Sequence, residues 1–439
     1  MKIGFIPIDD RPVCYLLPKL ISEIDEDIEL FLPERNLLGN LVKPANVEAI
    51  FDWLRKLPEL DAIILSLDTV AYGGLISSRR CSDSFEEIYN RIETLKNILE
   101  TKQAKIYAFS SIMRISNNNI NEEEKEYWNI WGKKIFEYSF NQSKNGVSDT
   151  DVPEEILKDY LDTRNRNFEI NKVYLKWQKE NFFETLIFSK DDCAEYGLNV
   201  DEANELQNLG GFIKTGADEI PLSLFSCAIK GEIKIAPVFL EPEYVDLISN
   251  YEDISIQKSV FSQLELAGCK IVNENEADIL LYVNNFVEKQ GEIVMKVPTK
   301  NFDKKWVSPS KPYMIADVRF ANGADNAFVE ELFETDFDEK FYGYSAWNTS
   351  ANSLGSLICV AKTRYLAKKY NEKAFKKLQI VRFLDDWAYQ ANVRQTCGKE
   401  ILSDMKKWES IVCKKFDLYP KIMYKLPWNR MFEVEIEFI

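Results

Sequence analysis

Residues 184–192 read ETLIFSKDD, a short apolar run that closes on polar residues and two adjacent aspartates. Its apolar residues are consecutive rather than alternating, which is typical of a parallel strand buried on both faces. Nine further runs have this form, at residues 2–10, 28–34, 61–69, 105–111, 211–219, 234–241, 277–285, 313–325 and 341–348. Segments with helical periodicity follow most of them. This alternation predicts an α/β fold made mostly of parallel β-α units.

Two arrangements of these strands are considered. A TIM-barrel-like core is favoured, and the alternative is a pair of open, doubly wound sheets in two domains. We expect residues 1–360 to form the α/β core, which carries a helical insertion at about 113–180. Residues 361–439 are expected to form a C-terminal helical segment that ends in a strand.

Charge and composition exclude several classes of protein. The chain has 439 residues and a formal net charge of −16, which repels nucleic acid and anionic membranes, so we expect neither as a partner. The eight cysteines are scattered and no signal peptide is recognised, which indicates a cytoplasmic protein. Without histidine, acid–base chemistry must use Asp, Glu, Tyr, Lys or Cys. The oligomeric state is left open.

Carboxylates gather where the predicted strands end, as the pairs Asp9-Asp10, Asp191-Asp192 and Asp218-Glu219 and the single residues Asp68, Asp317 and Asp325. In α/β folds ligands bind at the carboxyl ends of the strands. One aspartate in this place can cap the next helix. Adjacent carboxylates, however, repel each other unless a cation, an arginine or a hydroxyl-rich ligand lies between them, and this repulsion can turn one of them into a general acid.

Groups suited to bind a sugar or another polyol accompany these acids. Asparagine side chains both donate and accept hydrogen bonds, arginine grips carboxylates, and aromatic rings can stack on a sugar face. The expected substrate-binding residues are Asp9, Asp10, Arg11, Asp68, Tyr72, Arg114, Asn118, Asn284, Asn322, Trp347, Asn348 and Asn352.

The segment LDDWAYQANVRQ, residues 384–395, is predicted to be helical. Asp385 and Asp386 stand four and three residues before Tyr389, a spacing compatible with one face of an α-helix. We expect this helix to pack on the core through ion pairs rather than to take part in catalysis.

Nine segments together resemble the bacterial family catalogued as domain of unknown function 4127. They are IPIDDRP (6–12), SLDTVAYGGLISSR (66–79), RISNNN (114–119), YLDTRNRNFEIN (160–171), SKDDCAEYGL (189–198), TGADEI (215–220), ADVRFANGAD (316–325), YSAWNTSANSLGS (344–356) and LDDWAYQANVRQ (384–395). They span almost the whole chain in the same order. The resemblance implies that these motifs belong together, and it implies no activity.

A local resemblance concerns mechanism. TGADEI is similar to the GGDE signature of family 20 β-hexosaminidases, and SKDD and AWNTSAN look like strand ends of O-GlcNAc hydrolases. Both groups are (β/α)8 barrels with substrate-assisted catalysis. The resemblance implies that Glu219 or Asp192 is the general acid, and that Asp218 or Asp191 orients the acetamido group of the substrate.

The favoured hypothesis is therefore a glycoside hydrolase, hexosaminidase-like, that acts on a small amino-sugar glycoside or cell-wall fragment by Asp/Glu acid–base chemistry. It needs no cofactor and no metal. One alternative is a Mg²⁺- or Mn²⁺-dependent α/β enzyme for a phosphorylated or carboxylated small molecule, with Asp9, Asp10, Asp68 and Asp192 as ligands. The other is a non-catalytic sugar or polyol binding protein.

Overall fold

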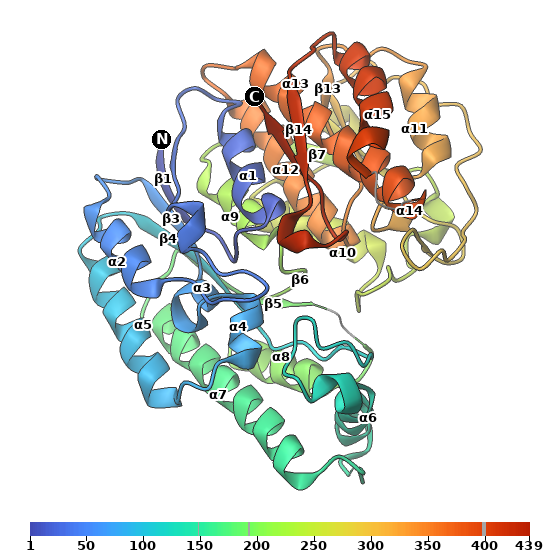
Figure 1. Cartoon of the computed structure of the whole chain (residues 1–439). Coiled ribbons are helices and arrows are strands. Elements are labelled where there is room, and N and C mark those ends of the chain that lie inside the picture. The colour runs from blue at the N-terminus through green and yellow to red at the C-terminus, as the bar shows by residue number, and fades with distance from the viewer. Residues whose placement is uncertain (148, 192–193, 397–400) are drawn as a thin grey trace. The chain divides into compact units, whose positions relative to one another are not determined.

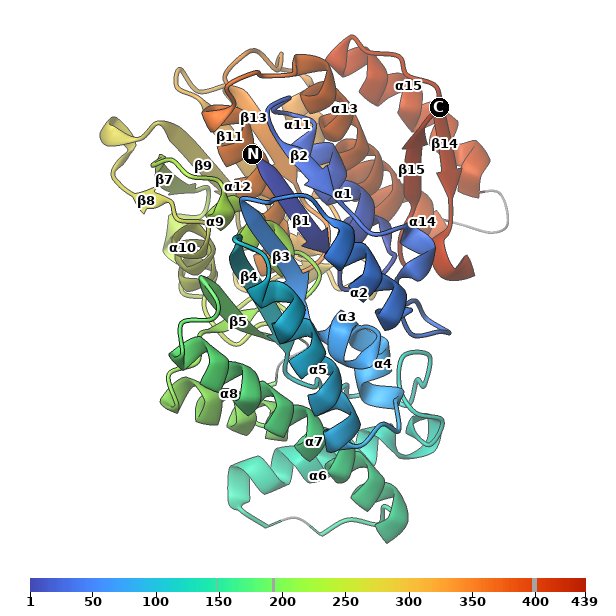
Figure 2. The same cartoon turned by 90° about the vertical axis from the view of Figure 1, so that its left-hand side faces the viewer.

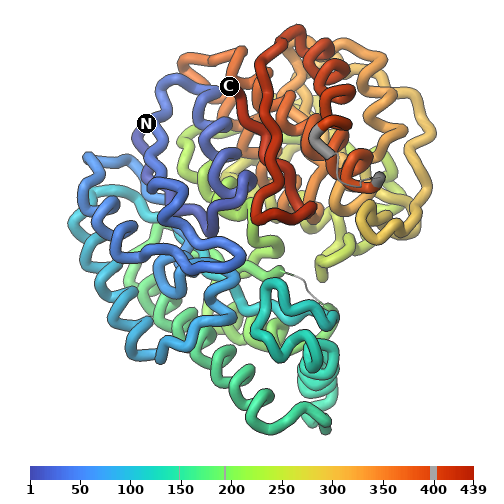
Figure 3. The backbone as a smooth tube through the Cα atoms, in the orientation of Figure 1, coloured from blue at the N-terminus to red at the C-terminus, as the bar shows by residue number. Residues whose placement is uncertain are grey.

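The computed structural model describes residues 1–147, 149–191, 194–396 and 401–439 (Figure 3). Backbone contacts divide the chain into two compact units. Unit 1 comprises residues 1–15 and 29–221, and unit 2 comprises residues 16–28 and 222–439. The sequence predicted a boundary near residue 360, between an α/β core and a helical extension. That boundary does not coincide with the division into these two units, and it stays a prediction.

The six-stranded sheet of unit 1 is parallel throughout, in the order β2-β1-β3-β4-β5-β6. Figure 1 labels β1, β3, β4, β5 and β6 of this sheet. Every residue of β3 is buried, which explains why its sequence is apolar throughout rather than alternating. The strands are β1 (Lys2–Ile6), β2 (Glu29–Phe31), β3 (Ala62–Ser66), β4 (Lys105–Ser111), β5 (Thr185–Lys190) and β6 (Ile213–Thr215).

Four helices of unit 1, α2, α5, α7 and α8, bury apolar side chains against one face of this sheet (Figure 2). In α5 these side chains include Ile88, Ile92, Leu95 and Leu99, which recur at helical spacing and form one stripe. The helices that begin in unit 1 are α1 (Pro12–Ser22), η1 (Arg35–Leu37), α2 (Val47–Lys56), α3 (Leu67–Tyr72), α4 (Leu75–Arg80), α5 (Phe85–Glu100), α6 (Trp128–Asn145), α7 (Glu154–Lys179), α8 (Leu198–Asn208) and α9 (Ile220–Ala228).

Unit 2 contains a five-stranded sheet in the order β13-β11-β9-β7-β8, again parallel. In both units the second strand lies at an edge beside the first, and the third strand lies on the other side of the first. Two small sheets pair β10 with β12 and β14 with β15. The strands are β7 (Lys234–Phe239), β8 (Lys270–Ile271), β9 (Ile279–Asn284), β10 (Gly291–Glu292), β11 (Tyr313–Asp317), β12 (Phe320–Ala321), β13 (Phe341–Ser345), β14 (Ile422–Lys425) and β15 (Glu435–Phe438).

Helices α10 and α12 cover one face of the sheet of unit 2 with apolar side chains such as Val260 and Leu357. Within the described ranges, no helix combines the length and the apolar character needed to cross a membrane. The remaining helices are η2 (Pro242–Tyr244), α10 (Ile256–Leu266), η3 (Glu274–Glu276), α11 (Asn326–Phe333), α12 (Ser350–Leu366), α13 (Glu372–Arg382), η4 (Phe383–Val393), α14 (Arg394–Thr396), α15 (Ile401–Phe416) and η5 (Pro427–Asn429).

The predicted α/β class with mostly parallel strands is confirmed, and each of the ten predicted strand segments contains a strand. The favoured barrel is not confirmed. Among the described residues the parallel strands form two sheets of six and five strands, and these orders correspond to the alternative of open, doubly wound sheets. Strands β8, β10 and β14 were not predicted. Of these, β8 and β10 contain two residues each, which are too few to show a period.

The predicted helix at 384–395 is present, and residues 383–393 form a π-helix, η4. Gln390 Nε2 donates to Asp385 Oδ1 at 3.1 Å, five residues apart. Arg382 Nη2 lies 3.1 Å from Asp386 Oδ2, an ion pair between the end of α13 and η4, and the expected packing of this helix on the core through ion pairs stays a prediction.

Candidate functional site

The strand order of unit 1 creates a switch point between β1 and β3. From β1 the chain moves outward to β2, and it then returns to build β3 on the other side of β1. The loops after β1 and β3 therefore leave the sheet in opposite directions, and in doubly wound sheets this is where ligands bind. Asp9, Asp10 and Arg11 follow β1, and Asp68 lies in the first turn of α3, directly after β3.

The loops at this switch point hold one another in place. Thr69 Oγ1 donates to Pro7 O at 2.7 Å and to Ile8 O at 3.1 Å, so the end of β3 is tied to the end of β1. Gly73 ends α3 with φ of 89°, and a Cβ there would lie 2.5 Å from Pro44 Cβ, so the turn requires glycine. Asp9, Asp10 and Asp68 therefore lie on loops that hydrogen bonds and close packing hold in place.

Arg11 lies between two of the predicted acids. Its Nε donates to both oxygens of Asp9, at 3.0 and 2.9 Å, and its Nη2 donates to Asp218 Oδ1 at 2.5 Å. All three side chains are largely buried. Asp218 follows β6, so the chain returns from that edge strand toward the end of β1. The arginine thus relieves the repulsion between two carboxylates.

Asp68 is the predicted acid with the clearest chemical perturbation. Its side chain is almost fully buried, and its Oδ2 accepts a hydrogen bond from Ser111 N at 2.9 Å. Burial raises the pKa of this carboxyl from 3.8 to about 6, while the Ser111 hydrogen bonds and the charge of Arg79 act in the opposite direction. The group therefore changes its protonation near neutral pH.

The other predicted acids of unit 1 lie at the same edge of the sheet. Asp10 and Asp191 are half-buried after β1 and β5, and Glu219 is buried after β6. The charge of Asp191 favours the charged form of the nearby Arg79 guanidinium. Asp192 lies outside the described residues.

Three predicted binding residues of unit 1 make contacts within the fold. Tyr72 is 4% exposed and its ring lies in the apolar core, so it offers no face for a sugar. Arg114 Nη2 pairs with Glu123 Oε2 at 2.9 Å. Asn118 Oδ1 accepts from Ile120 N at 2.9 Å and closes a turn.

The five remaining predicted residues belong to unit 2, at the carboxyl ends of its strands. Asn284 Nδ2 donates to Asp317 Oδ1 at 2.8 Å, and Asn322 Nδ2 donates to Glu292 Oε1 at 2.8 Å. The other three, Trp347, Asn348 and Asn352, follow β13 and are buried. The predicted residues thus form two strand-end clusters, one in each unit.

Two carboxyl groups of unit 2 were not predicted as site residues. Asp317 ends β11, and burial together with the charge of Asp325 raises its pKa to about 7. Tyr344 Oη donates to it at 2.9 Å. Glu252 Oε1 accepts from Ala351 N at 2.7 Å in the first turn of α12, and burial raises its pKa to about 7. Glu252 follows no predicted strand, so the sequence carried no signal for it.

Glu252→Gln tests this environment. Because the folded-state pKa is raised from 4.5 to about 7, the contribution of Glu252 to stability is complete below pH 4.5 and is lost as the pH rises through 7. We expect the glutamine variant to be more stable than the wild type at pH 8, by up to about 3 kcal/mol, and equal to it at pH 4. Urea denaturation at both pH values measures this, with exposed Glu243→Gln as the control. Equal differences at both pH values would contradict the assignment.

Within the described ranges, no group of three or more Cys, Asp or Glu side chains is arranged to hold a metal ion. Of the ligands named for the metal hypothesis, Asp9 is engaged by Arg11 and Asp68 by Ser111. Asp192 lies outside the described residues.

The fold and the site define an α/β protein with one parallel sheet of six strands and one of five, and with carboxyl-rich strand ends. The chain belongs to the family described as "Protein of unknown function (DUF4127)", whose profile matches residues 3–417, and the predicted membership is confirmed. No curated protein matches the chain.

One similar solved structure is the "Crystal structure of PH0766 from Pyrococcus horikoshii OT3". It shares 12% sequence identity over 83% of this chain and 97% of that chain, with a TM-score of 0.16. The local resemblance to hexosaminidases and O-GlcNAc hydrolases is not shown by these comparisons.

Proposed function

We propose that the protein is a glycoside hydrolase that binds a small amino-sugar glycoside at the carboxyl edge of the sheet in unit 1. The observation that carries the proposal is the raised pKa of Asp68, about 6, at the switch point between β1 and β3. A carboxyl group that titrates there is protonated often enough to donate and ionised often enough to accept a proton near neutral pH.

In this proposal Asp68 gives its proton to the glycosidic oxygen as the bond to the anomeric carbon breaks. Water completes the reaction at the anomeric carbon, and its proton passes to a second carboxylate at the same edge. Asp191 is the candidate for this second role, because it is partly exposed after β5. These two proton transfers need no histidine and no cofactor.

The cluster of Asp9, Arg11 and Asp218 has a binding role in the proposal. Asp218 is held by two guanidinium nitrogens of Arg11, at 2.5 and 3.2 Å, so it suits the orientation of a substrate better than proton donation. A carboxylate fixed in this way can accept hydrogen bonds from sugar hydroxyls or from an acetamido N–H. Glu219, which follows it in the chain, stays a candidate acid.

A panel of nitrophenyl glycosides tests the proposal, including N-acetylglucosaminide and N-acetylgalactosaminide, with and without EDTA. We expect release of nitrophenol from at least one amino-sugar glycoside, unchanged by EDTA. No release from any member would overturn the hydrolase proposal. Saturable sugar binding without release would then favour the binding protein, and EDTA-sensitive turnover of phosphorylated compounds would favour the metal-dependent enzyme.

A further inference from the structure

Unit 2 contains a cavity of about 290 Å³, open to solvent, that the proposed function does not use. Part of its wall is apolar and is formed by Val297, Pro298, Phe320 and Ala391. Phe320 belongs to β12 and Ala391 to the π-helix η4, so segments far apart in the sequence meet here. The volume is close to the lower limit of small-molecule pockets, which is about 300 Å³.

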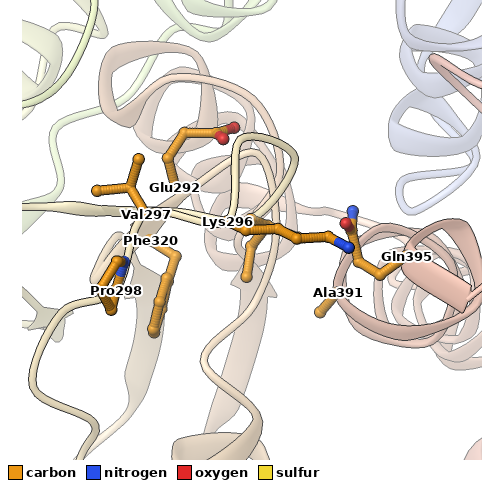
Figure 4. A pocket seen from close by; sticks show the side chains of 8 residues that line it. Glu292, Lys296, Val297, Pro298, Phe320, Ala391 and Gln395 are labelled. Carbon is orange, nitrogen blue, oxygen red and sulfur yellow. The ribbon is translucent and has the colours of Figure 1, made fainter.

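A lysine enters this cavity from a tight turn. Figure 4 shows the side chain of Lys296 extending toward Ala391 and Gln395. Lys296 has φ of 55°, a left-handed conformation that is uncommon for lysine and that concentrates at functional sites. Among the described residues it forms no ion pair within 4.0 Å. The ammonium group is therefore available to a ligand.

Backbone hydrogen bonds fix the turn that carries Lys296. Glu292 and Val297 exchange two backbone hydrogen bonds of 2.9 Å each, which close the turn around residues 293–296. The carboxylate of Glu292 accepts from Asn322 Nδ2 and from Met295 N. These two donors hold the carboxylate in place, and it forms no ion pair with Lys296 within 4.0 Å among the described residues.

The opposite wall is equally fixed. The π-helix η4 is anchored by Asp386, whose Oδ2 accepts from Ala346 N at 2.6 Å. π-Helical turns are rare and are often found at functional sites. Ala391 presents only a methyl group, which leaves room in the cavity, and Gln395 adds an amide beside the end of the lysine (Figure 4).

We propose that this cavity binds a small monocarboxylate with an apolar body. The carboxylate pairs with Lys296 and Gln395, and the body packs on Val297, Pro298 and Phe320. A single cation suits one negative charge, and the apolar wall favours a carbon skeleton over a bare inorganic anion. This site is independent of the hydrolase proposal.

Titration calorimetry of the full chain with benzoate and hexanoate tests the site. We expect saturable binding by the wild type, binding at least about tenfold weaker in Lys296→Met, and no binding in Ala391→Leu, which fills the cavity. Lys300→Met, which removes an exposed lysine paired with Asp303, is the matched control and keeps wild-type affinity. Circular dichroism checks the fold of each variant.

Four results would overturn the proposal. They are the absence of binding to the wild type below about 10 mM, unchanged affinity in Lys296→Met, equal binding of the neutral analogue benzamide, and binding of inorganic phosphate as tight as that of benzoate. The last result would indicate a general anion site rather than a site for monocarboxylates.

Discussion

Replacing Asp68 with asparagine is expected to lower the rate of glycoside hydrolysis by about 10²–10⁴-fold, the range that one general acid or base contributes. Asparagine has nearly the same shape and its side-chain oxygen can still accept from Ser111 N, so the hydrogen bond of 2.9 Å can persist. What it lacks is the proton that the reaction needs. The measurement is the hydrolysis rate of the best glycoside in the panel.

The same variant is expected to be more stable than the wild type at alkaline pH. The pKa of Asp68 is raised from 3.8 to about 6 in the folded state, so its stabilising contribution is complete below pH 3.8 and is lost as the pH rises through 6. At pH 8 the wild type holds a buried charge that asparagine does not have. We expect the variant to be more stable there by up to about 3 kcal/mol, with no difference at pH 3.5.

The matched control is Asp61→Asn. Asp61 is exposed, and it accepts a hydrogen bond from Lys2 N at 2.7 Å just before β3, at the opposite end of the strand from Asp68. Its replacement should leave hydrolysis unchanged. Full activity in Asp68→Asn, with a stability that depends on pH as in the wild type, would contradict both the catalytic role and the buried charge.

Removing the Arg11 side chain is expected to have the largest effect on stability. Arg11→Met leaves the buried carboxylates of Asp9 and Asp218 without the guanidinium that lies between them. Removal of one partner from a buried ion pair typically costs about 3–5 kcal/mol, because the remaining charge is uncompensated. Urea denaturation at pH 7 measures the loss.

Two further variants make this test specific. Arg11→Lys keeps the charge but lacks the planar group that contacts both acids at once, so we expect a loss between those of the wild type and Arg11→Met. Arg55→Met breaks an exposed pair with Asp52 and should cost less than about 1 kcal/mol. Equal losses in Arg11→Met and Arg55→Met would show that the buried cluster has no special role.

The sequence predicted the strands of this fold well, because consecutive apolar residues that end in polar ones are typical of strands buried on both faces. It also placed Asp9, Asp68, Asp191 and Asp218 at strand ends, where the structure has them. The order of the strands in the sheets could not be predicted in this way. It depends on which strands pair across the sheet, and no periodicity within one strand encodes that, so the choice between one barrel and two open sheets was out of reach.

The chemical state of the acids depends on contacts that are distant in the sequence. Arg11 and Asp218 are 207 residues apart and meet because the chain after β6 returns toward β1. The raised pKa of Asp68 comes from burial, which is a property of the folded state. Tyr72 shows the opposite case, because its ring was expected to be available for stacking on a sugar and is instead part of the core.

The most direct test of the central claim is the titration of Asp68 itself. In protein labelled with ¹³C at the aspartate carboxyl groups, the resonance that is present in the wild type and absent in Asp68→Asn should titrate with a pKa of about 6. It should also shift when N-acetylglucosamine is added. A resonance that titrates near the ordinary value of 3.8 and does not respond to the sugar would contradict the account.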